Sequence, residues 1–243
     1  MDSLTEQIID TWNESEINFR ANNYEGNFGD EQVRITPRGN GRLVLSSVHG
    51  LKHRRQDQGQ DKIKEEDEGT GGLCLALGKL LDITTAVVLD GGTLPNDANN
   101  EPNHLIKTEL EKAGLPASGG VLIDLHGMGL YSKKSGERFK HEQDIVIGMG
   151  LELVATATVG ETLTNAFHNE NMVVDLGGNK TYWRAKDSKR MTMWAQNRGV
   201  SAVQIEILDA FRQKKSSIEN RARLVRALVA GINEVQTVMN LNK

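Results

Sequence analysis

Short β-rich runs alternate along the chain with segments of helical periodicity, and this alternation is the feature that most constrains the fold. The pattern predicts strands over residues 32–36, 42–48, 85–89, 120–125, 144–148, 172–176 and 202–208. Between them it predicts helices over residues 70–81, 103–113, 160–169, 189–198 and 218–239. Such alternation is typical of α/β layer folds.

Several predicted strands are apolar on both faces, as in Val121-Leu122-Ile123 and in residues 85–89. Strands of this kind lie between helices that cover each side of a sheet. The helix over residues 218–239 has the clearest helical period, so we expect it to cover the sheet. The sequence therefore predicts an α/β fold, a three-layer α/β/α sandwich with a central mixed sheet.

Length and composition are those of one globular domain. The chain has 243 residues, 26% charged and 37% hydrophobic, and a chain of this size buries a sufficient core without disulfides. Its single cysteine, Cys74, lies in an apolar run, which predicts a buried, inert thiol and a reducing compartment. We expect a single domain over residues 1–243, with residues 1–30 as an N-terminal extension too polar to assign.

The net charge is −4 and both signs are spread along the chain, which excludes the basic footprint of a nucleic-acid-binding protein. No apolar stretch approaches the roughly 18 residues that a membrane span needs. The first residues lack the basic and apolar regions of a signal peptide. We expect a soluble cytoplasmic protein without nucleic-acid or membrane partners, and its oligomeric state stays open.

Two histidines stand at the carboxyl ends of predicted strands, and a glycine follows each of them. His49-Gly50 ends the run 42–48, and His126-Gly127 ends the run 120–125. Imidazole is the commonest metal-binding side chain, and glycine lets a ligand approach the backbone closely. The pair favours one shared metal ion over the alternative of two hydrogen-bonded structural histidines.

Acidic residues near these histidines can complete such a site. Asp124 shares a strand face with His126, so it can hold the second ring nitrogen or anchor a loop by accepting backbone N–H groups. A catalytic zinc site commonly has three protein ligands, and the acidic run 65–68 can supply the third. Asp67 is the first candidate within that run, with Glu66 and Glu68 as alternatives.

Glu206 is the candidate catalytic carboxylate. In the strand over 202–208, Gln204 and Glu206 share one face, and apolar residues occupy the other. An edge strand with one solvated face would explain this alternation. The functional interpretation places Glu206 beside a metal, where it takes a proton from metal-activated water and returns it to a leaving nitrogen.

With these residues in place, the chain resembles the N-formylglutamate amidohydrolase family, zinc hydrolases with a phosphorylase/hydrolase-like α/β/α fold. The resemblance covers about residues 43–212 and, more distantly, extends to phage-type poly-γ-glutamate hydrolases. Its motifs occur in family order: Ser47-Val48-His49-Gly50, Asp67-Glu68-Gly69-Thr70, Ile123-Asp124-Leu125-His126-Gly127, residues 144–148 and residues 199–207. The resemblance implies that His49, Asp67 and His126 are zinc ligands and that Glu206 is the catalytic carboxylate.

The chain departs from this family where the substrate carboxylate is held. The family pattern Asp-x-Asn-Arg reads here Asp97-Ala98-Asn99-Asn100, so an amide replaces the guanidinium that grips a carboxylate with two hydrogen bonds. Asn99 remains as a candidate substrate-binding residue. Arg184 and Arg190 can replace the missing arginine or can be solvated surface residues.

These observations predict a zinc-dependent amidohydrolase, with one divalent ion per chain, that acts on a small N-acyl amino acid or a γ-glutamyl-type amide. Its partner is then a small-molecule or peptide-like amide substrate. The alternative is a non-catalytic ligand-binding or scaffold protein that keeps the hydrolase fold. Phosphoryl transfer is disfavoured because the sequence has no P-loop motif.

Overall fold

The computed structural model describes residues 1–26, 28–57, 60–89, 97–99, 101–134, 137–151, 153–177, 185–187 and 189–241. For residues 55–57, 60–61, 131–134 and 137–139 it describes the backbone alone. Within these ranges, no helix is both long enough and apolar enough to cross a membrane.

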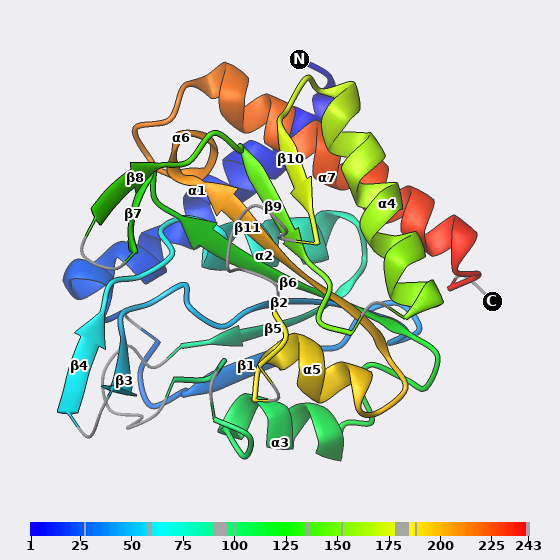
Figure 1. The fold of residues 1–243 in the computed structure, drawn as a ribbon, viewed down its shortest axis with the longest axis horizontal. Coiled ribbons are helices and arrows are strands. Elements are labelled where there is room, and N and C mark those ends of the chain that lie inside the picture. The colour runs from blue at the N-terminus through cyan, green and yellow to red at the C-terminus, as the bar shows by residue number, and fades with distance from the viewer. Residues whose placement is uncertain are drawn as a thin grey trace.

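A seven-stranded mixed sheet forms the centre of the fold (Figure 1). Its order is β1-β5-β2-β6-β11-β9-β10. Strands β5, β2, β6 and β11 run parallel to one another, whereas β1 and β9 pair antiparallel with β5 and β11. The strands are β1 (Val33–Thr36), β2 (Leu43–Ser47), β5 (Thr84–Val88), β6 (Val121–Met128), β9 (Ile145–Gly148), β10 (Val174–Leu176) and β11 (Ser201–Leu208).

Helices cover both faces of this sheet (Figure 1). One face packs against α2 (Thr70–Leu80), α4 (Val154–Asn169) and α7 (Ile218–Val238), with α1 (Ser3–Tyr24) lying across α2 and α7. The other face packs against α3 (Leu105–Lys112) and α5 (Met191–Gln196). The predicted three-layer sandwich with a mixed sheet is confirmed.

Side chains of the central strands alternate between two apolar clusters, as strand geometry requires. On β6, Val121, Ile123 and Leu125 pack towards α1, α2 and α7, whereas Leu122 packs towards α3 and α5. Both faces are therefore buried, which explains the continuous apolar runs in the sequence. The covering role predicted for the last helix is confirmed, because α7 contributes Leu224, Leu228 and Ile232 to the first cluster, among other residues.

The predicted elements exist, but several boundaries differ. Helix α4 begins at Val154, six residues before the predicted start at residue 160. Its first turns are rich in β-branched residues, which have low helix propensity. Thr156, Val159, Leu163 and Phe167 nevertheless form one buried stripe, so tertiary packing overrides local preference.

Residues 1–30, unassigned from the sequence, contain the long helix α1. Asp2 caps its start by accepting a hydrogen bond from the backbone N–H of Thr5 at 2.9 Å. Only a narrow stripe of the helix is buried, and its apolar members are Ile8, Ile9, Trp12 and Phe19. This stripe joins the main core cluster, although most of the helix sequence is polar.

Two hairpins and a short helix also escaped the sequence analysis. The predicted polar loop 50–69 contains the hairpin of β3 (His53–Asp57) and β4 (Gln60–Lys64). The loop 127–144 contains the end of β6 and the hairpin of β7 (Tyr131–Lys134) and β8 (Glu137–Lys140). Helix α6 (Asp209–Arg212) follows β11 directly. The hairpin strands lack the apolar alternation by which strands are recognised.

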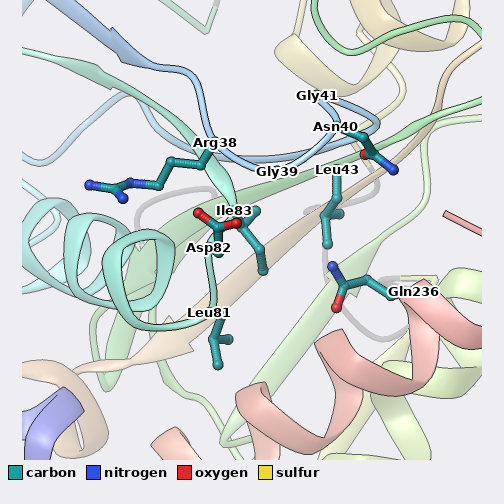
Figure 2. A pocket seen from close by; sticks show the side chains of 9 residues that line it. All are labelled: Arg38, Gly39, Asn40, Gly41, Leu43, Leu81, Asp82, Ile83 and Gln236. Carbon is teal, nitrogen blue, oxygen red and sulfur yellow. The ribbon is translucent and has the colours of Figure 1, made fainter. Parts of the chain in front are cut away.

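A pocket of about 410 Å³ lies at the amino ends of β2 and β5 (Figure 2). It is lined largely by the 38–43 and 81–83 segments and by Gln236 of α7. Because His49 follows the opposite, carboxyl end of β2, this pocket is separate from the predicted metal site.

The packing of α1 predicts a strong effect of Trp12→Ala. Trp12 is 1% exposed, and its indole N–H donates to the Gly69 carbonyl oxygen at 2.8 Å. Truncating a buried tryptophan costs about 3–5 kcal/mol of unfolding free energy, measured by chemical denaturation. Ile17→Ala on the same helix is the control, because Ile17 is 65% exposed and should cost less than about 0.5 kcal/mol. Equal losses would contradict the packing of α1.

Candidate metal centre

One face of the sheet changes from apolar to polar along the strands. Towards α3 and α5, the first row in register is Val44, Leu122 and Ala202. The next row towards the carboxyl ends is Ser46, Asp124 and Gln204, and the last pairs His126 with Glu206. All eight side chains are buried. The apolar row belongs to the hydrophobic core, and the polar rows form the inner part of the candidate site.

His49, Asp67 and His126 come together beyond these rows. The Asp67 Oδ2 atom lies 3.2 Å from His126 Nδ1 and 3.7 Å from His49 Nδ1. The two imidazole rings are nearly perpendicular, at 83°, with centroids 4.7 Å apart. Their potential ligand atoms all lie within 4.8 Å of one another. Two imidazole nitrogens and a carboxylate are a donor set that fits zinc.

A carboxylate holds the other nitrogen of each ring. Asp124 Oδ2 lies 2.8 Å from His126 Nε2, and Asp97 Oδ1 lies 2.7 Å from His49 Nε2. Such contacts hold metal-binding histidines in one ring orientation and tautomer. The predicted link between Asp124 and His126 is therefore present as a hydrogen bond, and Nδ1 of both rings is directed at Asp67.

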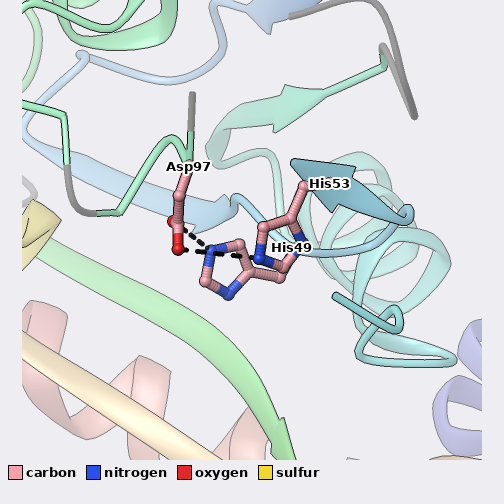
Figure 3. A group of neighbouring side chains, drawn as sticks. All are labelled: His49, His53 and Asp97. Carbon is pink, nitrogen blue, oxygen red and sulfur yellow. Dashed lines mark hydrogen bonds and ion pairs between the residues drawn. The ribbon is translucent and has the colours of Figure 1, made fainter. Parts of the chain in front are cut away.

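A second group, His49, His53 and Asp97, also brings potential ligand atoms together (Figure 3). Its imidazole rings are stacked, with centroids 4.0 Å apart and planes 3° from parallel. Imidazole binds a metal in the plane of its ring, so two stacked rings cannot direct their lone pairs at one ion. The perpendicular pair His49 and His126 can, and this favours the site with Asp67.

Asp67 reaches the site from the loop before α2. Its backbone N–H donates to the His49 carbonyl oxygen at 2.8 Å, and its own carbonyl oxygen accepts from the Thr70 hydroxyl at 2.8 Å. Of the three acidic candidates at 66–68, only Asp67 joins the two histidines in a metal-capable group among the described residues. The backbone bond to His49 ties two candidate ligands together directly.

The charges within this cluster are strongly coupled. Burial alone would lower the pKa of His126, but the carboxylates of Asp124, Asp67 and Glu206 together outweigh it and raise that pKa well above its usual value. Burial raises the pKa of Asp67, and hydrogen bonds from His126 and His49 reverse the effect, so the net shift is downward. A cation must displace the protons of these histidines, and its affinity should therefore fall as the pH falls.

Glu206 lies on a central strand, so the edge-strand explanation of its alternation is wrong. Strand β11 lies between β6 and β9 and is buried along its whole length. Glu206 is the direct register partner of His126, and its Oε1 atom accepts a hydrogen bond from Gln204 Nε2 at 2.6 Å. Burial, only partly offset by the charge of His126, raises the pKa of Glu206 to about 7.

Gln204 links Glu206 to two predicted substrate-binding residues. Its Oε1 atom lies 3.4 Å from Arg190 Nη1 and 3.5 Å from Asn99 Nδ2. Asn99 also accepts a hydrogen bond from the Met191 backbone N–H at 2.9 Å. The structure thus brings Asn99 and Arg190 to Gln204, the hydrogen-bond partner of Glu206, whereas Arg184 lies outside the described residues.

We expected the glycines after the two histidines to let a ligand approach the backbone. In the structure, other parts of the protein pack against these glycines instead. A Cβ at Gly127 would overlap the guanidinium group of Arg212, and one at Gly50 would lie 3.0 Å from the Gly71 Cα atom and 3.2 Å from the Phe19 ring. Side chains from α1 and α6 therefore pack where these glycines leave space.

Sequence reasoning missed three parts of the site: the Asp97–His49 contact, the placement of His53, and the contact of Gln204 with Glu206. In the sequence, Asp97 stands out only as part of the Asp-x-Asn motif of the family that the chain resembles. The four-residue spacing of His49 and His53 was an available signal. Across 48 residues of sequence, however, only the fold shows that Asp97 meets both rings.

No family model matches the chain, and no curated protein matches it in sequence. Its fold is similar to a bacteriophage poly-gamma-glutamate hydrolase, with a TM-score of 0.55 and 12% identity over 87% of this chain and 93% of that one. It is also similar to N-formylglutamate amidohydrolase from Ralstonia eutropha, with a TM-score of 0.54 and 11% identity over 86% and 98% of the two chains.

A third similar structure is the gene product Atu2144 from Agrobacterium tumefaciens, with a TM-score of 0.54 and 13% identity over 86% of this chain and 96% of that one. Similarity at these identities shows a shared fold. The resemblance to the N-formylglutamate amidohydrolase family is therefore confirmed at the level of the fold, and the roles of individual residues stay predictions.

The contact between Asp124 and His126 predicts that Asp124→Asn weakens zinc binding while the protein stays folded. Losing a carboxylate that orients a ligand typically lowers metal affinity by about 10–100-fold, measured by competition with a chelator. Asp175→Asn is the control, because Asp175 is also buried but lies on the edge strand β10. Wild-type zinc affinity in a folded Asp124→Asn protein would contradict the assigned role.

The ring geometries predict different outcomes at His53 and His126. His126→Ala should reduce the bound zinc to well below one ion per chain, because it removes a candidate ligand of the perpendicular pair. His53→Ala should keep one ion per chain, since its ring is stacked on His49. Zinc content after dialysis, with circular dichroism to verify folding, tests this. The reverse result would identify the stacked group as the metal site.

Proposed function

We propose that this chain is a zinc-dependent amidohydrolase that cleaves the amide bond of a small N-acyl amino acid or a γ-glutamyl-type substrate. The observation that carries the proposal is the direct pairing of Glu206 with His126 in the β6–β11 register. It sets a buried carboxyl group beside a group of residues able to hold a metal. A base and a metal at one place are the parts that amide hydrolysis needs.

His49, Asp67 and His126 would hold the zinc ion. When bound there, zinc supplies Lewis acidity, which polarises a carbonyl group and makes water more acidic. Asp97 and Asp124 keep the two imidazole rings directed towards Asp67. The hydrogen bonds around the histidines therefore prepare the site before a cation arrives.

Glu206 performs the proton transfers in this proposal. Its Oε1 atom accepts from Gln204, which leaves Oε2 for the proton of the attacking water. Glu206 then donates that proton to the leaving nitrogen, so the carboxylate is regenerated. A pKa of about 7 suits both steps, because the group can accept and release a proton near neutral pH.

A substrate carboxylate has a charged partner in Arg190. Arg190 contacts Gln204, and its positive charge lowers the pKa of Glu206, so the guanidinium lies close to the proposed base. This charge favours an anionic amide, such as an N-acyl amino acid or a γ-glutamyl peptide.

Glu206→Gln should lower kcat by roughly 10²–10⁴, the usual contribution of a positioned acid or base, with zinc content near one per chain. Wild-type turnover should fall as the pH is lowered and Glu206 becomes protonated, because a protonated carboxyl group cannot accept a proton. Screening zinc-loaded protein against N-acyl amino acids and γ-glutamyl peptides supplies the substrate for both measurements. Near wild-type kcat with full zinc occupancy would overturn this mechanism.

Removing zinc separates the enzyme from the alternative of a non-catalytic binding protein. Chelation should abolish hydrolysis, and adding zinc back should restore it. A folded wild-type protein that binds no zinc and hydrolyses none of these amides would instead favour a binding or scaffold role for the fold.

A further inference from the structure

Arg212 is a buried cation that holds three backbone carbonyl groups. The residue ends α6 and is 5% exposed. Its Nε donates to the Ile207 oxygen at 2.9 Å, its Nη1 to the Glu68 oxygen at 2.6 Å, and its Nη2 to the Met128 oxygen at 3.4 Å. Among the described residues, none of the ion pairs involves Arg212.

The three carbonyl groups belong to three of the segments that build the site. Ile207 follows Glu206, Glu68 follows Asp67, and Met128 stands two residues after His126. One planar guanidinium therefore spans the end of β11, the loop before α2 and the end of β6. Because its donors have a fixed fork geometry, it sets the positions of these segments relative to one another.

Two glycines of the site leave space for this arginine. Gly127 adjoins His126, and a Cβ there would overlap the guanidinium. Gly69 has a left-handed φ of +87°, and a Cβ there would overlap the Arg212 carbonyl oxygen. Burying a charge is costly, and Arg212 has no carboxylate partner among the residues that the structure describes, so its three hydrogen bonds must compensate for lost hydration.

We propose that Arg212 is a positioning residue that sets the placement of Asp67 relative to His126 and Glu206. This inference rests on the proposed function, because it assigns these residues to a zinc site and a base. Arg212 touches neither metal nor substrate in this proposal. It acts through the backbone of the residues that do.

Arg212→Lys tests the proposal, because an ammonium keeps the charge but cannot span three separated carbonyl groups. We expect zinc affinity to fall about 10–100-fold, as when other supporting partners of a metal ligand are lost. The visible spectrum of the cobalt-substituted protein should also change, because it reports ligand geometry. With an active substrate, kcat should fall while KM changes little.

Arg223→Lys is the matched control. The Arg223 guanidinium also donates to two backbone carbonyl oxygens, of Glu170 and Asn171, on segments without a candidate site residue. The Arg223→Lys variant should keep wild-type zinc affinity and the wild-type cobalt spectrum, even if its melting temperature is lower than that of the wild type. Measurements at low temperature, with folding verified by circular dichroism, keep general instability from imitating the effect.

Unchanged zinc affinity and cobalt spectrum in folded Arg212→Lys protein would overturn the positioning role. Equal loss of zinc affinity in Arg223→Lys would overturn it as well, because the effect would then be general. If Arg212→Lys does not fold, Arg212→Ala with added methylguanidinium replaces it, and rescue of zinc affinity is expected. Absence of rescue in the folded variant would contradict the proposal. Hydrolysis by the wild type separately decides the proposed function.

Discussion

The negative charge of carboxylates buried in and beside the sheet must be compensated by hydrogen bonds. The candidate site depends on which residues make these hydrogen bonds. Asp124 is fully buried. It accepts a hydrogen bond from Ser46 Oγ at 2.6 Å, and its carboxylate lies 2.8 Å from His126 Nε2. Asp97 is compensated by His49 and by the Asn99 backbone N–H. Without such partners each ion would cost several kcal/mol in desolvation. The same contacts orient the imidazole rings, so the hydrogen bonds that compensate the buried charge also arrange the candidate metal ligands.

Support for the site also comes from the N-terminal helix. Glu16 of α1 accepts hydrogen bonds from the backbone N–H groups of Gly69 and Gly72, both at 2.9 Å. Its carboxyl group thus caps α2, although burial raises the pKa of Glu16 to about 7. A Cβ at Gly72 would overlap this carboxyl group, which explains the small residue there. Together with Trp12 and Arg212, Glu16 holds the loop that carries Asp67.

Much of the fold and part of the site follow from local sequence pattern. Apolar runs such as 121–123 identified the central strands, because burial on both faces leaves no polar alternation. Period-two geometry placed Asp124 and His126 on one face, and the structure joins them by a hydrogen bond. Local pattern failed for α1, whose buried stripe is narrow, and for the hairpins, whose sequences lack apolar alternation.

The sequence by itself determined which strands form the core and which residues with metal-binding chemistry stand at their carboxyl ends. It left open which acidic residue of the run 66–68 is the third ligand, and it offered an edge strand as the position of Glu206. Only the tertiary structure decided that Asp67 meets both histidines, that β11 is central, that Asp97 contacts His49, and that Arg212 bonds to the backbone beside Asp67 and Glu206. The physical reason is the sequence separation of the residues that interact. Strand and helix patterns depend on neighbouring residues, whereas Glu68 and Arg212 are 144 residues apart in the sequence. Contacts at that separation arise when the sheet and its helices pack, and no local period encodes them.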